Sequence, residues 1–202
     1  DVLTPTASVT TTGNLSSSNH LKAGSYTGAQ YISALGGADA ANYTYSAVVG
    51  DYTVNQLALT AAIATGSNTY GSAVSTGAAS FTNAISGDTV TASTVSIVSP
   101  SYSTANKLIA GTYKQSITST LTGTDAANYT LTGGFTTATN NYTVNQLALT
   151  GSIAAGSSTY GDSLVPGSVT WTNKVGSDVL TPTASVTTTG NLSSSNHLKA
   201  GS

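Results

Sequence analysis

The nine-residue stretch YTVNQLALT occurs twice in the chain, at Tyr52–Thr60 and again at Tyr142–Thr150. In each copy the apolar residues alternate with other residues, but the phase of the alternation changes in the middle, at Asn55–Gln56 in the first copy. Alternation with a period of two predicts β-strands, and a change of phase turns the apolar side chains toward the opposite face. The stretch therefore predicts two consecutive strands that bury opposite faces, without a Gly, Pro or Ser-rich linker between them.

The same alternation extends through the rest of the chain. It is clear in TVTASTVSIVS (Thr89–Ser99) and in TYKQSITSTLTG (Thr112–Gly123), where Gln115 stands between Tyr113 and Ile117. These segments are rich in Val, Ile, Thr and Tyr and are bounded by Gly, Asn, Asp and Ser, which is typical of strands and turns. No window has a sustained helical stripe of apolar residues. We therefore expect an all-β fold of about seven short strands per repeat, with at most one helical turn around Asp125–Asn128.

Two repeat lengths are present in the chain. The two copies of YTVNQLALT lie 90 residues apart, and the 25 residues Asp1–Ser25 recur without change 177 residues later, at Asp178–Ser202. Such internal repetition is typical of tandem arrays. The sequence predicts modules of about 90 residues: the C-terminal part of one in residues 1–55, a complete one in 56–145, and the N-terminal part of the next in 146–202. With stiff junctions such as the one at Asn55–Gln56, we expect the modules to be strung end to end as an elongated rod.

Composition excludes several classes of protein. The chain has seven Asp and five Lys but no Arg, Glu, Cys or Met, and its formal net charge is −2. The lack of Cys excludes a disulfide framework, a thiolate metal site and a cysteine nucleophile. The low charge argues against a nucleic-acid partner, which requires a basic face. No signal peptide or membrane span is recognisable.

The candidate functional residues are few. His20 and His197 are copies of one position with no second His nearby, which favours an exposed surface residue, and no Ser lies in a pattern typical of a catalytic triad. Calcium prefers several carboxylates in one cluster, and the spacing of Asp39, Asp125 and Asp178 fits turn formation better. We therefore expect no catalytic, no cofactor-binding and no metal-binding residues, no cofactor and no enzymatic activity.

Two kinds of aromatic residue deserve separate interpretation. Tyr43 and Tyr129 follow the Asp-containing turns, and we expect each ring to enter the core with its hydroxyl bonded to backbone, as a tyrosine corner does. Trp171 stands where the preceding repeat has Phe81. Core packing is the simpler explanation of this exchange, and stacking on a carbohydrate is the alternative.

The motifs resemble a known family. LGGADAANYT (Leu35–Thr44) and LTGTDAANYT (Leu121–Thr130) are similar to the L-[ST]-G-x-D-A-x-N-Y-T segment of YDG/MBG-type repeats. STYGD at Ser158–Asp162 and NTYG at Asn68–Gly71 resemble the start of those repeats, although Ser72 replaces the Asp of the pattern. Such repeats occur in tandem in large secreted bacterial adhesins of the filamentous-haemagglutinin, two-partner-secretion and biofilm-matrix kind. The resemblance implies a β-grasp-like or small β-sandwich module.

The resemblance also implies a function. We expect a structural stalk or spacer segment of a repetitive extracellular bacterial adhesin or biofilm-matrix fibre, which projects an adhesive tip and bridges cells or matrix. The alternative is a repeat module that binds carbohydrate or exopolysaccharide. The expected partners are neighbouring repeats of the same chain, and like chains in a filament or a matrix exopolysaccharide are further possibilities. The expected location is outside the cell or on its surface.

Overall fold

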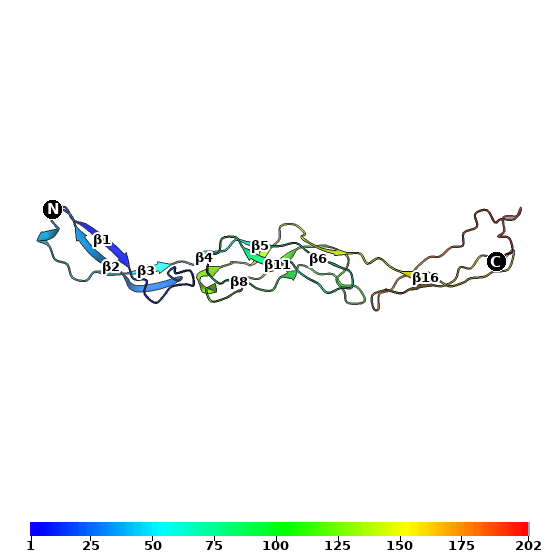
Figure 1. Cartoon of the computed structure of the whole chain (residues 1–202), viewed down its shortest axis with the longest axis horizontal. Coiled ribbons are helices and arrows are strands. Elements are labelled where there is room, and N and C mark those ends of the chain that lie inside the picture. Colours follow the sequence, from blue (N-terminus) through cyan, green and yellow to red (C-terminus); the bar gives the residue numbers. More distant parts are fainter. Residues whose placement is uncertain (202) are drawn as a thin grey trace. The chain divides into compact units, whose positions relative to one another are not determined.

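The computed structural model describes residues 1–201 and confirms the predicted all-β class, with 34% of residues in strands and 3% in helix. Figure 1 shows the course of the chain from the N-terminus to the C-terminus. The only helical elements among the described residues are two single 3₁₀ turns, η1 (Ala40–Asn42) and η2 (Ala126–Asn128). The turn η2 lies where the sequence predicted one.

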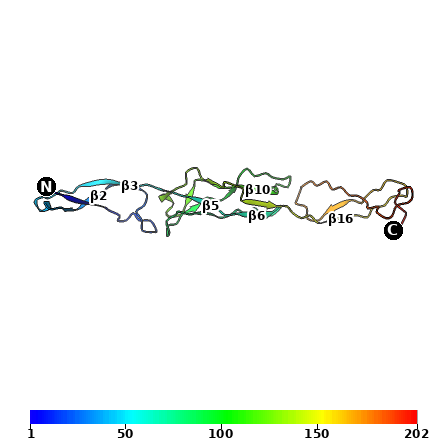
Figure 2. The same ribbon diagram turned by 90° about the horizontal axis from the view of Figure 1, so that it is seen from above.

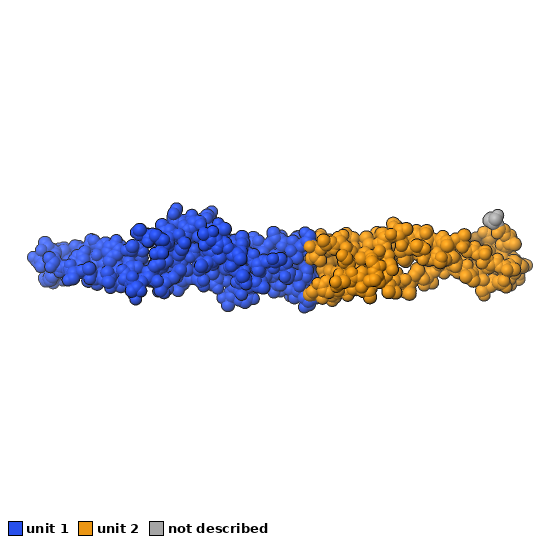
Figure 3. Space-filling view, turned by 90° about the horizontal axis from the view of Figure 1, so that it is seen from below, with its two compact units in different colours: residues 1–66, 75–99, 112–143 blue, residues 67–74, 100–111, 144–202 orange. Residues whose placement is uncertain are grey.

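The chain forms two compact units, coloured separately in Figure 3. Unit 1 comprises residues 1–66, 75–99 and 112–143, and unit 2 comprises residues 67–74, 100–111 and 144–202. Both units therefore draw on three separate stretches of sequence. These ranges do not test the predicted module boundaries, which stay a prediction.

Most of the strands belong to unit 1. Its strands are β1 (Thr4–Val9), β2 (Gly24–Gly36), β3 (Val49–Val54), β4 (Leu57–Ala58), β5 (Ala61–Ile63), β7 (Ala79–Phe81), β8 (Thr91–Ala92), β9 (Ser96–Ile97), β11 (Gln115–Ile117), β12 (Leu121–Thr122), β13 (Tyr129–Thr130) and β14 (Phe135–Thr136). Unit 2 contains β16 (Gly151–Ile153) and β17 (Val169–Trp171). The remaining strands, β6 (Gly66–Thr69), β10 (Gly111–Tyr113) and β15 (Tyr142–Asn145), form a sheet in the order β10-β15-β6. Both β6 and β10 are labelled in Figure 2.

The longest strands form an antiparallel sheet in the order β1-β2-β3 at the N-terminal end (Figure 1). The strand β1 pairs with the second half of β2, from Thr4 opposite Gly36 to Val9 opposite Gln30. The strand β3 pairs with the first half and the middle of β2. This sheet connects the first copy of the 25-residue repeat to the chain that follows it.

The core of unit 1 is built by small sheets. The pairs β5–β7 and β8–β12 are antiparallel, β9 and β14 flank β11, and β13 runs parallel to β4. Their buried apolar residues are Leu59, Ile63, Ile117, Tyr129 and Leu131. The sequence region Gln56–Asn145 contains twelve short strands rather than the expected seven, because most runs of alternation are interrupted after two or three paired residues.

Asparagine side chains complete the pairing where these short strands end. The amide of Asn83 accepts the Thr60 N–H and donates to the Ala58 carbonyl, both at 2.8 Å. Ninety residues later, Asn173 makes the same two bonds to Thr150 and Ala148 at the same distances. An amide side chain offers a donor and an acceptor, so it replaces one residue of a β-ladder.

The break predicted in YTVNQLALT lies between two strands in the first copy, whereas the change of buried face stays a prediction. In the first copy β3 ends at Val54 and β4 begins at Leu57, so Asn55–Gln56 lies between strands. In the second copy Tyr142 and Val144 are buried at 0% and 2% exposure, and the strand β15 ends at Asn145. The continuation Gln146–Thr150 is not a strand, unlike its counterpart in the first copy.

Gln115, which stands between Tyr113 and Ile117 in the same phase of the alternation, has a fully buried side chain. Its carbonyl oxygen accepts the Gly77 N–H at 2.7 Å, and its amide nitrogen donates to the carbonyl of Ala64 and to the side chain of Asn141, both at 3.0 Å. These bonds satisfy backbone groups of a loop that has no ladder partner. The burial of Gln115 is stabilising only because all of its polar atoms are bonded.

We predict that Gln115→Leu lowers the free energy of unfolding by roughly 2–3 kcal/mol, because the Gly77 N–H and the Ala64 carbonyl lose their buried partner. Chemical denaturation monitored by tyrosine fluorescence measures this change. The matched control is Gln56→Leu, at an exposed Gln, for which the loss should stay below about 1 kcal/mol. Equal effects in the two variants would contradict the structural role given to Gln115.

Candidate functional site: serine hairpins bound by aspartate and tyrosine

Three short hairpins recur at corresponding places in the chain. They are closed by the bridges Leu15–Leu21, Tyr102–Leu108 and Leu192–Leu198, and we call these segments the serine hairpins. In the first, the Asn19 N–H donates to the Ser16 carbonyl at 3.0 Å, and the Ser16 N–H donates to the His20 carbonyl at 2.8 Å. The other two hairpins make the same backbone bonds.

The conformation of the serine hairpins depends on an Asn. The backbone φ is positive at the three corresponding asparagines, with values of 62°, 54° and 60° at Asn19, Asn106 and Asn196. Asn adopts this left-handed conformation at lower cost than most residues with a side chain. The fixed turn leaves the N–H groups at its tip free to bind acceptors from elsewhere.

In unit 1 the first serine hairpin binds the carboxylate of Asp125, which is 1% exposed. One carboxylate oxygen accepts the Ser17 N–H at 3.0 Å, and the other accepts the Thr89 N–H at 2.8 Å. The hydrogen bonds to backbone N–H of Thr89 and to Ser17 lower the pKa of Asp125. A carboxylate held by two N–H groups joins three segments that are far apart in sequence.

The close approach of these segments explains the Gly two residues before the Asp. Gly123 has a φ of 117°, and a Cβ at this position would lie 2.4 Å from the Thr89 carbonyl oxygen. Gly37 is the corresponding residue in the first copy of the motif, with a φ of 110° and 2.3 Å to the Val2 carbonyl oxygen. Only Gly fits both the left-handed backbone and the contact.

A second acid, Asp88, binds the same hairpin. Its carboxylate accepts the Ser18 N–H at 3.0 Å and the Tyr129 hydroxyl at 2.6 Å. The Tyr129 ring is 3% exposed, and its hydroxyl also accepts the Ile85 N–H at 3.2 Å. Tyr129 is therefore a core residue whose hydroxyl holds an aspartate in place.

The hydrogen bonds around Asp88 determine its protonation. Burial by itself would raise the pKa of Asp88, but bonds from Ser18, Tyr129 and Ser16 outweigh burial and lower the pKa to about 2. Burial and the bond to Asp88 raise the pKa of Tyr129. The carboxylate is therefore ionised and the phenol neutral at physiological pH, which is the pairing that makes this bond charge-assisted.

A partial counterpart of this cluster lies in the first copy of the 25-residue repeat. Asp39 accepts the Val2 N–H at 2.6 Å, as Asp125 accepts the Thr89 N–H, and Tyr43 donates to Asp1, as Tyr129 donates to Asp88. The cluster is more open here, because the Tyr43 ring is 43% exposed.

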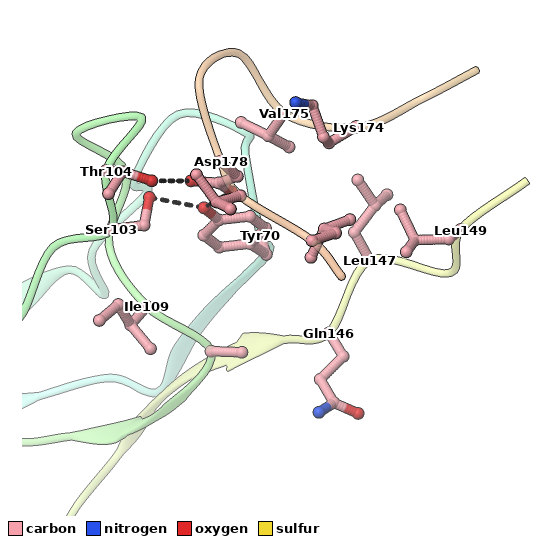
Figure 4. Close-up of a pocket in the computed structure, with 13 residues that line it drawn as sticks. Tyr70, Ser103, Thr104, Ile109, Gln146, Leu147, Leu149, Lys174, Val175 and Asp178 are labelled. Atoms are coloured by element: carbon pink, nitrogen blue, oxygen red, sulfur yellow. Dashed lines mark hydrogen bonds between the residues drawn. The ribbon is translucent and has the colours of Figure 1, made fainter. Parts of the chain in front are cut away.

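Another partial counterpart lies in unit 2 around Asp178. Its carboxylate accepts the Ala105 N–H of the second serine hairpin at 3.1 Å, as Asp88 accepts the Ser18 N–H of the first. Thr104 donates its hydroxyl to Asp178 at 3.3 Å, and Tyr70 donates its hydroxyl to the same carboxylate. Figure 4 shows Asp178, Tyr70 and the hairpin residues pointing toward one another.

The bond from Tyr70 is the largest influence on Asp178 and lowers its pKa, whereas burial raises the pKa of Tyr70. The Tyr70 hydroxyl also lies 2.6 Å from the Ser103 hydroxyl of the hairpin. Tyr70 belongs to the NTYG motif. Through its single hydroxyl, this motif contacts both the second serine hairpin and Asp178.

The sequence predictions for the aspartates and tyrosines need two corrections. Asp125 accepts backbone N–H groups, but from Ser17 and Thr89, which lie outside its own turn, and the turn η2 has no side-chain cap. The prediction that the ring enters the core is confirmed for Tyr129 and wrong for Tyr43. The Tyr129 hydroxyl bonds to backbone as predicted, by accepting the Ile85 N–H, and it also donates to the side chain of Asp88.

Two other predictions concern the histidines and the tryptophan. His20 and His197 are exposed, and each ring contacts the hydroxyl of a hairpin serine, at 2.9 Å from Ser18 and 3.3 Å from Ser195. Trp171 is half-buried in β17, and its indole nitrogen is the one buried side-chain polar atom without a partner among the described residues. It lines an open cavity of about 530 Å³ in unit 2.

Sequence reasoning missed the residues that bind the hairpins. Asp88 was not among the candidate residues, and neither were Ser16, Ser17 and Ser18. The available signal was the common spacing: the serine hairpins and the aspartates Asp1, Asp88 and Asp178 share the same intervals of 87 and 90 residues.

Within residues 1–201 no group of three or more His, Cys, Asp or Glu is placed to hold a metal ion. In the same part of the chain, no helix is long and apolar enough to cross a membrane. No family model, curated protein sequence or solved structure matches the chain.

We predict that Tyr129→Ala lowers the free energy of unfolding by about 3–5 kcal/mol, because it removes a buried ring. Tyr129→Phe should cost about 1–3 kcal/mol, because it keeps the ring but removes the donor to Asp88. Equilibrium unfolding in urea gives both values. The control is Tyr43→Phe at the exposed counterpart, where a loss as large as that of Tyr129→Phe would contradict the proposed difference between the two clusters.

We predict that the chain loses stability as the pH falls from about 4 to about 2. The pKa of Asp88 is about 2 in the folded chain and 3.8 ordinarily, so its contribution is complete above pH 4 and disappears as the folded carboxylate is protonated. Thermal unfolding across this range measures the effect. Asp88→Asn should be less stable at neutral pH and have a shallower pH dependence, so that its melting temperature approaches that of the unchanged chain below pH 2.

Proposed function

We propose that the chain is a structural spacer segment of a repetitive extracellular bacterial adhesin or biofilm-matrix fibre. In this proposal, modules of about 90 residues, of β-grasp-like or small β-sandwich type, follow one another as a rod that projects an adhesive tip and bridges cells or matrix. The neighbouring repeats of the same chain are its main partners. The chain performs no catalysis in this function.

The observation that carries the proposal is the repeated contact between a serine hairpin and an aspartate. Asp88 binds the first hairpin and Asp178 binds the second through the corresponding backbone N–H groups, those of Ser18 and Ala105. A contact that recurs at the repeat interval is what a nearest-neighbour array requires. Because it uses charge-assisted bonds to fixed N–H groups, it favours one orientation between successive repeats.

The composition supports the same function. The chain combines a very low number of charged residues with abundant small polar residues, and it keeps the D-A-A-N-Y-T motif that resembles adhesin repeats. A spacer needs a stable and repetitive fold and no specific ligand site. The resemblance and the recurrence of the contact together favour an extracellular location and a role in a surface fibre or matrix.

The alternative function, binding of carbohydrate or exopolysaccharide, has one specific observation in its favour. The indole N–H of Trp171 has no partner among the described residues, and the ring lines an open cavity with Pro182 and Thr183. A tryptophan ring that lines a cavity offers a sugar a stacking surface. A glycan array with the unchanged chain and with Trp171→Phe tests this function, which requires binding that the substitution abolishes.

The spacer function predicts an extended particle in dilute solution. A globule of 202 residues has a radius of gyration of about 17 Å, whereas a rod that rises roughly 30–40 Å per repeat should give about 20–28 Å. Small-angle scattering extrapolated to zero concentration measures this value. A radius at or below about 17 Å would contradict the spacer function.

A further inference from the structure

Unit 2 contains a groove beside Asp178 that is open in this chain. The groove encloses about 630 Å³ and is lined by the second serine hairpin, by Gln146–Leu149 and by Lys174–Leu180 (Figure 4). Its apolar residues are accessible, with Leu149 39% exposed, Leu180 42% exposed and Val179 78% exposed. Apolar side chains gathered around a groove are typical of a docking surface.

Unpaired donors surround this groove. Four backbone N–H groups, those of Thr104, Ala110, Leu149 and Val179, have no hydrogen-bond partner among the described residues. The side-chain amide of Gln146 also has no partner within residues 1–201, and in Figure 4 it points away from the rest of the lining. Unpaired donors around an apolar groove are suited to bind a strand that carries hydrogen-bond acceptors.

The counterparts of all five donors in unit 1 bind one segment, Leu121–Thr130. The N–H groups of Ser17 and Thr89 bind Asp125 at 3.0 and 2.8 Å. The Ala23 N–H binds the side chain of Asn128 at 2.9 Å.

The last two donors bind the backbone of the same segment. The Leu59 N–H donates to the Thr130 carbonyl at 2.8 Å, and the Gln56 amide donates to the Ala127 carbonyl at 2.9 Å. The segment also runs parallel to β4, with Tyr129 opposite Leu57 and Thr130 opposite Ala58. Unit 1 therefore shows what fills a groove of this kind.

We propose that the groove of unit 2 binds the segment Leu35–Thr44 of a second copy of this chain. This segment carries the same D-A-A-N-Y-T motif as Leu121–Thr130. Among the described residues it receives one of the five bonds that its counterpart receives: Asp39 accepts a single N–H, and the exposed side chain of Asn42 has no partner.

The corresponding bonds define the docked arrangement. Asp39 accepts the N–H groups of Thr104 and Val179, and Asn42 accepts the Ala110 N–H. Tyr43 and Thr44 run parallel to Leu147 and Ala148. Each of these contacts has a counterpart in unit 1.

Docking proceeds by exchange of identical segments. In the second copy Val2 and Asp1 already bind Asp39 and Tyr43, at the place that Val179 and Asp178 of the first copy need. Because Asp178–Ser202 and Asp1–Ser25 have the same sequence, one can replace the other without loss of a contact type. The exchange replaces each lost contact with an identical one, and the contacts in the groove are additional. These additional contacts make domain exchange favourable.

The exchange joins the C-terminal part of one copy to the N-terminal part of the next, so every oligomer keeps one free groove at one end and one free segment at the other. Such a heterologous contact does not close on itself and generates an open series of oligomers. This inference deepens the proposed spacer function, because it names a second copy of the chain as the partner. It rests on that function only in assigning a role to the resulting filament.

Refolding at a series of protein concentrations tests the exchange, because each segment can then pair either within its own chain or with a second chain. The chain is unfolded in urea, diluted and examined by sedimentation velocity. We expect monomers at low concentration and an unbroken series of oligomers at high concentration. A chain that stays monomeric at every concentration would overturn the exchange while leaving the spacer function, which depends on the radius of the monomer, unaffected.

A matched pair of variants separates docking from folding. Asn42→Ala removes an acceptor that only docking uses, so it should raise the dissociation constant about tenfold and leave the unfolding midpoint of the monomer unchanged. Asn128→Ala removes the acceptor of the Ala23 N–H within one chain, so it should lower the unfolding midpoint. Association that is unchanged in Asn42→Ala would overturn the proposed arrangement.

Cross-linking tests the register. A chain with Ala148→Cys is refolded together with a chain with Thr44→Cys and treated with a short bismaleimide, and we expect a covalent heterodimer. Ala58→Cys with Thr130→Cys in one chain is the positive control, because these residues are opposite in β4 and β13. Ser157→Cys, exposed and outside the groove, replaces Ala148→Cys in the negative control. Equal cross-linking at positions 148 and 157 would contradict the register.

Discussion

The carboxylate of Asp125 is the constraint on which the organisation of unit 1 depends. It is 1% exposed, and its two oxygens accept N–H groups from Ser17 and Thr89, which lie 108 and 36 residues away in sequence. A buried carboxylate is tolerable only when such donors surround it. The position of the serine hairpin, the left-handed backbone at Gly123 and the ring of Tyr129 beside Asp88 are all consequences of holding these three segments together.

The cluster fits a chain that has few charges and very short strands. Strands of two or three residues leave many backbone groups outside any ladder, and these groups need partners if they are buried. The chain supplies them with short polar side chains: Asn83 and Asn173 close equivalent strand ends, and Gln115 satisfies the Gly77 N–H in the core. The abundance of Asn, Ser and Thr is therefore a structural requirement, since backbone pairing alone does not complete the fold.

The sequence predicted the all-β class, the helical turn at Asp125–Asn128 and the break between strands at Asn55–Gln56, because these depend on local alternation and on turn residues. It did not predict the burial of Gln115 or the exposure of Tyr43, since both depend on which distant segment covers the residue. Gln115 shares the phase of Tyr113 and Ile117, but the alternation does not show which distant backbone groups its side chain bonds. Tyr43 and Tyr129 share one motif, and only the surroundings separate a 43% exposed ring from a 3% exposed one.

Near-identical repeats face a particular difficulty, because any segment has several equivalent partners within its own chain. Apolar contacts alone discriminate poorly between such partners, as they depend little on direction. Bonds from fixed N–H groups to Asp88 and Asp125 are directional, and a shift of one residue leaves a buried charge without donors, which is costly. The same bonds that specify the correct register cannot distinguish Asp1–Ser25 from Asp178–Ser202, because every donor and acceptor in the two segments is the same. These bonds therefore fix the register of a segment but do not determine which copy of the segment is bound. Under this condition segments exchange between chains without misfolding.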